Sequence, residues 1–164
     1  KIIVLVRDVE EILASFIKWS EKESTSFVNQ YEAKTIEEKC DMLMNQEGQI
    51  VKELIGIKHL LDHQPKEMYH IVEYNDLCDN PKKTIEGIYD FLGIYRFNHR
   101  YTNLDQFYVN GMKYDDKIVG EGLHTIETNS INSNNYNEFK ENVNDILPKS
   151  IIEKYNNLNF WKGK

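Results

Sequence analysis

Residues Lys1–Trp19 read KIIVLVRDVEEILASFIKW, and this segment is the most informative about the fold. Residues 2–6 form an unbroken apolar, largely β-branched run, which is typical of a strand buried on both faces of a parallel sheet. Asp8 is a good N-cap with Glu11 three residues later, in a pattern close to a capping box. Apolar residues then recur at helical spacing, at Val9, Ile12, Leu13, Phe16 and Ile17. The stretch therefore predicts a strand, a tight turn and a helix that packs back on the sheet.

Two side chains of this stretch are candidates for binding an anion. Arg7 falls at the carboxyl end of the predicted strand, where ligands bind in open α/β sheets. Its guanidinium can donate two parallel, charge-assisted hydrogen bonds to a phosphate. Ser15 lies eight positions later and borders the sheet-facing side of the predicted helix, so the two side chains form a plausible clamp for one phosphate. The alternative is that Arg7 is a strand-end charge paired with Glu10 or Glu11 and that Ser15 only fills a helix flank.

Composition limits the class of protein. A length of 164 residues corresponds to one domain, and 40% hydrophobic and 12% aromatic residues exclude a disordered chain. The formal net charge of -7 argues against a broad nucleic-acid-binding surface. No apolar run approaches the ~20 residues of a membrane span, and the first residues lack a signal-peptide cleavage site. Cys40 and Cys78 show neither metal-ligand nor disulfide spacing, so we predict that both are reduced thiols and that the protein is cytoplasmic. From the charge and the lack of a long apolar run, we expect it to bind neither nucleic acid nor membrane.

The segment after the first helix is also predicted to be helical. Thr35 and Glu38 match a capping box, which predicts the start of a helix. Apolar residues then recur at helical spacing as far as about Leu61. They form either one long helix or two helices in series that meet near Gly48. His59 and His63 stand four residues apart at the end of this segment and could chelate a metal. A solvated helix end is the favoured interpretation because the sequence offers no third ligand, and no metal site is predicted.

A second strand, turn and helix follow. Met68–Glu73, MYHIVE, is suited to an inner strand, and Tyr74 stands at its end. Asn80 and Pro81 are typical of the start of a helix, and Gly93 is typical of its left-handed C-cap. The residues expected on the buried side of this helix are Ile85, Ile88, Tyr89 and Leu92.

Both units resemble segments of the sulfotransferase family. KIIVLVRDVEEILASF resembles the segment that binds the 3′-phosphate of the nucleotide, with Arg7 and Ser15 at the matching positions and Val9 in place of the usual Pro. EYNDLCDNPKKTIEGIYDFLGI is similar to the family's Tyr-Glu-Asp-Leu segment with its Phe-Leu-Gly ending, although Asn75 stands where Glu is usual. In the family the tyrosine lies against the adenine, which implies this role for Tyr74; the alternative is an aromatic residue that seals the core at a strand end.

The resemblance covers about the first 95 residues and has several implications. It implies an α/β fold with a parallel sheet flanked by helices, similar to P-loop-like proteins, in which residues 1–164 are the later part of one sulfotransferase-like domain. The missing N-terminal strand and phosphosulfate-binding loop, with the catalytic base, would precede Lys1, so the segment alone would be inactive. It also implies transfer of a sulfuryl group from 3′-phosphoadenosine 5′-phosphosulfate to an unidentified hydroxyl or amine acceptor. A nucleotide kinase-like phosphotransferase and a non-catalytic binding module remain alternatives.

The resemblance fades beyond residue 94. The family's late Arg-Lys-Gly cluster is absent, and Lys113 and Lys117 are only its nearest substitutes. The unperturbed pKa of a histidine, ~6.5, suits proton transfer, so His124 could line a pocket or act as an acid or base, but a surface or structural role is favoured. A closing helical portion over 136–157, broken near Pro148, and the pair Phe160-Trp161 are expected to return to the core.

Overall fold

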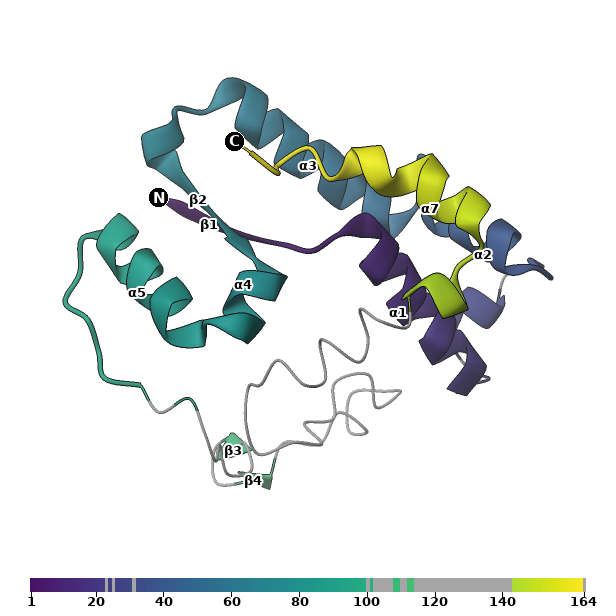
Figure 1. Ribbon diagram of the computed structural model, residues 1–164, viewed down its shortest axis with the longest axis horizontal. Coiled ribbons are helices and arrows are strands. Elements are labelled where there is room, and N and C mark those ends of the chain that lie inside the picture. Colours follow the sequence, from purple (N-terminus) through teal and green to yellow (C-terminus); the bar gives the residue numbers. More distant parts are fainter. Residues whose placement is uncertain are drawn as a thin grey trace.

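The computed structural model describes residues 1–22, 24, 26–30, 32–99, 101, 108–109, 112–113 and 143–163. Within these ranges, β1 and β2 form a two-stranded parallel sheet that is flanked by helices (Figure 1). The predicted α/β class, with a parallel sheet between helices, is thereby confirmed. A short antiparallel pair, β3 (Tyr108–Val109) and β4 (Met112–Lys113), forms a separate sheet.

The first strand–turn–helix unit lies where the sequence predicts it. β1 spans Ile2–Val6 and α1 spans Val9–Lys22. The backbone carbonyl of Asp8 accepts hydrogen bonds from the amides of Glu11 and Ile12, both at 3.0 Å, so the helix begins at the expected residue. The predicted apolar stripe faces the core, where Val9, Leu13 and Ile17 are almost fully buried.

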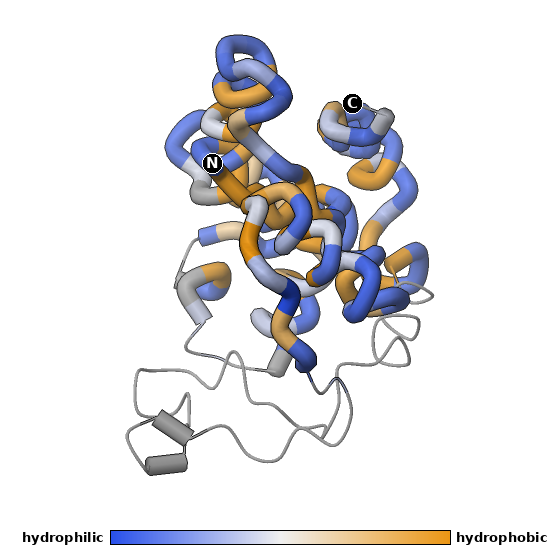
Figure 2. The backbone as a smooth tube through the Cα atoms, turned by 90° about the vertical axis from the view of Figure 1, so that its left-hand side faces the viewer, coloured by the Kyte–Doolittle hydropathy of each residue, from blue (hydrophilic) through white to orange (hydrophobic). Residues whose placement is uncertain are grey.

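The prediction that β1 is buried on both faces was wrong. The exposed fractions of Ile2, Ile3 and Leu5 are 44%, 43% and 57%, whereas Val6 at the end of the strand is buried. Among the described residues, β2 is the one strand paired with β1, so one edge of β1 has no strand beside it. Figure 2 shows the strand next to the N-terminus as a hydrophobic segment.

The middle of the chain forms two helices in series. After a 3-10 turn, η1 (Phe27–Gln30), come α2 (Ile36–Leu43) and α3 (Gln49–His63). Thr35 and Glu38 form the predicted capping box, in which the Thr35 hydroxyl accepts from the Glu38 amide at 3.1 Å and the Glu38 carboxylate accepts from the Thr35 amide at 3.1 Å. Gly48 is the N-cap of α3, so the second of the two predicted arrangements is present.

The second strand–turn–helix unit contains one more helix than predicted. A 3-10 turn, η2 (Lys66–Met68), leads into β2 (Tyr69–Glu73), which is followed by α4 (Tyr74–Asp79) and α5 (Pro81–Leu92). Gly93 closes α5 in the left-handed conformation, with φ of 74°. Asn80 occupies the N-cap position of α5, but its side chain makes no capping hydrogen bond.

The apolar residues of α5 that were expected on its buried side are only partly buried. The helix packs against β2, where the His70 and Phe91 rings stack at 5.3 Å between centroids. Since this sheet has two strands in the described chain, it offers α5 a narrow surface. The narrow sheet accounts for the incomplete burial.

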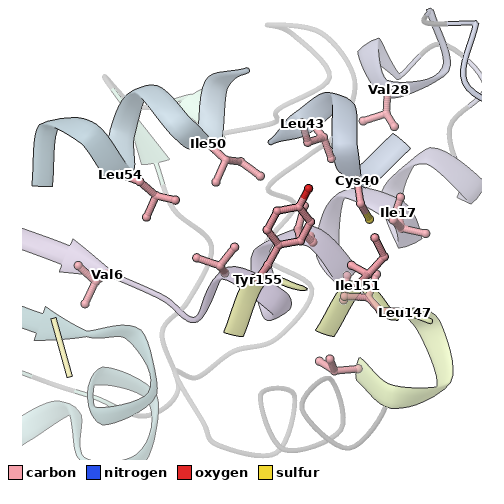
Figure 3. Packing of buried hydrophobic residues seen from close by; sticks show 14 of the residues in the cluster. Val6, Ile17, Val28, Cys40, Leu43, Ile50, Leu54, Leu147, Ile151 and Tyr155 are labelled. Atoms are coloured by element: carbon pink, nitrogen blue, oxygen red, sulfur yellow. The ribbon is translucent and has the colours of Figure 1, made fainter. Parts of the chain in front are cut away.

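The main core lies between the helices beyond the carboxyl end of the sheet. It joins residues from both ends of the chain, as Figure 3 shows for Val6, Ile17, Val28, Cys40, Leu43, Ile50, Leu54, Leu147, Ile151 and Tyr155. The last part of the chain contains a helical turn at 143–146, α7 (Lys149–Tyr155) and η4 (Asn156–Leu158). Trp161 is 3% exposed and packs edge-on against Phe160, which confirms the predicted return of this pair to the core.

One polar cluster fixes α7 on α2. Asp41 Oδ1 accepts a hydrogen bond from Lys154 Nζ and another from the Tyr155 hydroxyl, both at 2.7 Å. These two bonds lower the pKa of the Asp41 carboxyl. The cluster therefore ties the last helix to the middle of the chain most strongly while Asp41 is ionised.

No helix in the described ranges is long and apolar enough to cross a membrane. Cys40 and Cys78 are both free and buried, in agreement with the prediction of reduced thiols, and burial raises the pKa of Cys40 to about 12.

Candidate functional site

Arg7 and Tyr74 lie side by side at the carboxyl edge of the sheet. The last residues of the two strands, Val6 and Glu73, are register partners, so the next residue of each chain segment leaves the sheet at the same edge. In Figure 1, β1 leads from this edge into α1, and β2 leads into α4. The Cζ atom of Arg7 lies 4.6 Å from the centroid of the Tyr74 ring, which is within the range of a cation–π contact. The edge thus carries a cation on an aromatic platform.

The Arg7 guanidinium is also bound to a carboxylate. Arg7 Nε donates a hydrogen bond to Glu11 Oε2 at 3.2 Å, one helical turn along α1. The Glu11 side chain is only 4% exposed and that of Arg7 22%. Burying a carboxylate is costly unless a cation pairs with it, so this ion pair contributes to holding both side chains in place. The pairing of Arg7 with Glu11 was one of the sequence-based alternatives, and it is confirmed.

The C-terminal segment covers the start of α1. The Val9 amide, the first of the helix, donates to Asn159 Oδ1 at 2.9 Å, and Asn159 Nδ2 donates to Glu10 Oε2 at 2.9 Å. Lys162 Nζ donates to Asp8 Oδ2 at 2.6 Å. The amide of Asn159 thus satisfies a helix N-terminal N–H group that has no partner within the helix.

Lys162 is a second cation near this edge. Burial opposes the charge on its ammonium, but the hydrogen bond to Asp8 and the negative charges of Asp8, Glu10 and Glu73 raise its pKa. Its hydrogen-bond partner Asp8 is two residues beyond the end of β1, so Lys162 lies near that end of the strand. Neutral pH leaves the Lys162 side chain charged.

Tyr74 and Cys78 form a neutral pair beneath Arg7. Burial raises the pKa of the Tyr74 phenol, and Cys78, one turn along α4, raises it further against the opposing effect of Arg7. Burial also raises the pKa of the Cys78 thiol, although its hydrogen bond with Tyr74 and the charge of Arg7 both lower it. Since the thiolate is the reactive form of cysteine, Cys78 acts here as a packing residue.

The structure brings two of the three predicted binding residues together. Arg7 and Tyr74 are in contact at the sheet edge. Ser15 is on α1, two turns beyond Arg7, and its side chain is exposed. A shared phosphate contact between Arg7 and Ser15 therefore stays a prediction.

Other candidate residues lie away from this edge or outside the described residues. The His59 and His63 rings stack at 4.2 Å on α3, and His63 Nδ1 lies 2.9 Å from the His59 carbonyl oxygen. Within the described part of the chain, no cluster of three metal-ligating side chains is present. Of Lys113 the structure describes the backbone, in β4, and Lys117 and His124 lie outside the described residues.

The contribution of the C-terminal segment to this edge was not predicted from the sequence. Asn159 and Lys162 reach α1 from about 150 positions along the chain. No local pattern indicates such a contact. Glu11, in contrast, was one of the two carboxylates that the sequence suggested as a partner of Arg7, and it is the one to which Arg7 is bound.

The protein is therefore of the α/β class, with a parallel sheet that carries the Arg7 guanidinium at its carboxyl edge. The chain matches the sulfotransferase domain family over residues 1–157, and it belongs to that family. The family uses 3′-phosphoadenosine 5′-phosphosulfate. Neither the curated proteins nor the solved structures contain a significant match to this chain.

Proposed function

We propose that this chain is part of a sulfotransferase that moves a sulfuryl group from 3′-phosphoadenosine 5′-phosphosulfate to a hydroxyl or amine acceptor. The observation that carries the proposal is Arg7 at the carboxyl edge of the parallel sheet, in a chain that belongs to the sulfotransferase family. The core draws on residues from Val6 to Trp161, which supports treating residues 1–164 as one domain.

The chemistry of Arg7 fits a phosphate ligand. A guanidinium stays charged at every physiological pH and donates several hydrogen bonds in a fixed plane, so it matches two phosphate oxygens at once. Contacts to Glu11 and Tyr74 fix the plane of this guanidinium before any ligand arrives. The carboxylates of Asp8, Glu10 and Glu11 are each hydrogen-bonded to a cationic or amide side chain, which reduces their repulsion of an incoming anion.

In this proposal Arg7 and Ser15 hold the 3′-phosphate of the nucleotide, and Tyr74 borders its adenine. Bound at this edge, the nucleotide supplies the activated sulfuryl group. Fixing the 3′-phosphate orients the donor, and positioning of this kind lowers the barrier of a transfer reaction by removing orientational freedom. The catalytic base and the acceptor pocket are not assigned to residues of this chain.

Calorimetry with the full-length protein tests the proposal. We expect adenosine 3′,5′-bisphosphate to bind tightly and ATP not to bind. Arg7→Ala is expected to weaken binding of the bisphosphate by at least about tenfold, because it removes a charged hydrogen-bond donor. The variant's circular dichroism spectrum must match that of the wild-type protein for this comparison.

Two results would contradict the proposal. Equal affinity for both nucleotides would favour a kinase-like phosphotransferase. Unchanged affinity for the bisphosphate in Arg7→Ala would remove Arg7 from the site. Ser15→Ala is a smaller change at the second predicted contact and is expected to weaken the same ligand by severalfold.

A further inference from the structure

The Arg7 guanidinium contacts one side chain from α1 and one from α4. Its Nε atom lies 3.2 Å from the buried Glu11 carboxylate, and its Cζ atom lies over the Tyr74 ring, 4.6 Å from the centroid. A free arginine side chain has many rotamers, and this freedom is lost when it binds a phosphate. Contacts that already fix the side chain reduce this loss.

Tyr74 is itself well fixed. It is the first residue of α4, immediately after β2, and its side chain is partly buried. Its phenol interacts with the buried Cys78 one turn further along the same helix. The ring is therefore a stable surface on which a guanidinium can rest.

The contact between Arg7 and Tyr74 limits what the tyrosine can do for the nucleotide. The face of the ring that Arg7 covers is not available for stacking an adenine. An adenine beside Tyr74 must use the other face or an edge of the ring, and the face toward Arg7 acts on the ligand only through Arg7.

We propose, as an extension that rests on the proposed function, that Tyr74 is a positioning residue. It holds the Arg7 guanidinium in the orientation that receives the 3′-phosphate. Its largest contribution to nucleotide affinity therefore depends on the 3′-phosphate and passes through Arg7.

Two ligands separate this role from direct contact with adenine. Adenosine 3′,5′-bisphosphate carries the 3′-phosphate, and adenosine 5′-monophosphate lacks it while keeping the same base. Tyr74→Leu removes the aromatic face but keeps apolar bulk, and Tyr74→Phe keeps the face but removes the hydroxyl. Calorimetry on the full-length protein is the measurement, with thermal unfolding as a check that each variant is folded.

We expect Tyr74→Leu to weaken the bisphosphate about tenfold, which is the size of a partly buried cation–π contact. The monophosphate should lose clearly less, no more than about threefold, which is the part that contact with the adenine supplies. Tyr74→Phe is expected to bind both ligands as the wild-type protein does. In an Arg7→Ala background, Tyr74→Leu should weaken the bisphosphate by no more than it weakens the monophosphate, since the side chain through which it mainly acts is gone. Tyr74→Met carries the same expectations and replaces the Leu variant if that protein does not fold.

Equal weakening of both ligands would overturn the inference, because it would mean that Tyr74 acts on the base or the common sugar. Additive losses in the Arg7→Ala background would overturn it as well. Failure of the proposed function has a different signature: Arg7→Ala alone would then leave bisphosphate binding unchanged.

Discussion

Removal of Arg7 should destabilise the fold through Glu11. The two side chains are 22% and 4% exposed, and their Nε and Oε2 atoms are 3.2 Å apart. At an effective dielectric constant of ~20, two unit charges at this separation attract by about 5 kcal/mol. This attraction offsets the cost of burying the carboxylate, so Arg7→Ala leaves much of that cost uncompensated. We expect the free energy of unfolding to fall by about 3 kcal/mol.

Adding Glu11→Gln to Arg7→Ala isolates the cause of this loss. The neutral amide needs no cation, so the double variant should recover about half of the lost stability and be more stable than Arg7→Ala alone. Urea unfolding followed by the fluorescence of the two tryptophans measures both free energies. Equal unfolding free energies for the single and double variants would mean that the unpaired Glu11 charge does not cause the loss of stability in Arg7→Ala.

Further predictions concern the rest of the fold. A Cβ atom at Gly48 would clash with the Leu43 carbonyl oxygen, so Gly48→Ala should lower the free energy of unfolding by about 2 kcal/mol. A Cβ atom at Gly56 would meet nothing within 4 Å, so Gly56→Ala should raise the free energy of unfolding by up to about 1 kcal/mol. Thermal unfolding measures both effects, and destabilisation by both substitutions would contradict this prediction. The lowered pKa of Asp41 means that its bond to Lys154 adds stability above the ordinary carboxyl pKa and loses it as pH falls through the lowered value. Asp41→Asn should therefore lower the urea midpoint at pH 7 and have little effect near pH 2, and an equal effect at both values would count against the ion pair. Burial raises the pKa of both cysteine thiols, so alkylation with iodoacetamide at pH 7.5 should label neither in the folded protein and both in urea; rapid labelling of the folded protein would disprove their burial.

The elements of this fold follow from local sequence patterns. The capping box at Thr35 and Glu38, the proline start of α5 and its Gly93 C-cap act within a few residues, so the sequence alone predicts them. Burial was harder to predict. The apolar run at residues 2–6 is enough to predict the strand β1. The exposure of Ile3 and Leu5 depends on which strands and helices pack beside β1, and the run itself does not show this.

The candidate site shows the same division between local and distant causes. Arg7 was predicted from its place at the end of a strand, and its link to Glu11 follows helical spacing. The contact between Arg7 and Tyr74 depends on the register between two strands that are far apart in sequence. The contacts of Asn159 and Lys162 with the start of α1 depend on the packing of the whole chain, and no sequence motif predicts them.

A crystal structure of the full-length protein with adenosine 3′,5′-bisphosphate would show directly whether Arg7 binds the 3′-phosphate. We expect the 3′-phosphate oxygens to lie at about 2.7–3.0 Å from nitrogen atoms of the Arg7 guanidinium, which still contacts the Tyr74 ring. A 3′-phosphate bound elsewhere, with Arg7 still engaged only by protein side chains, would contradict it.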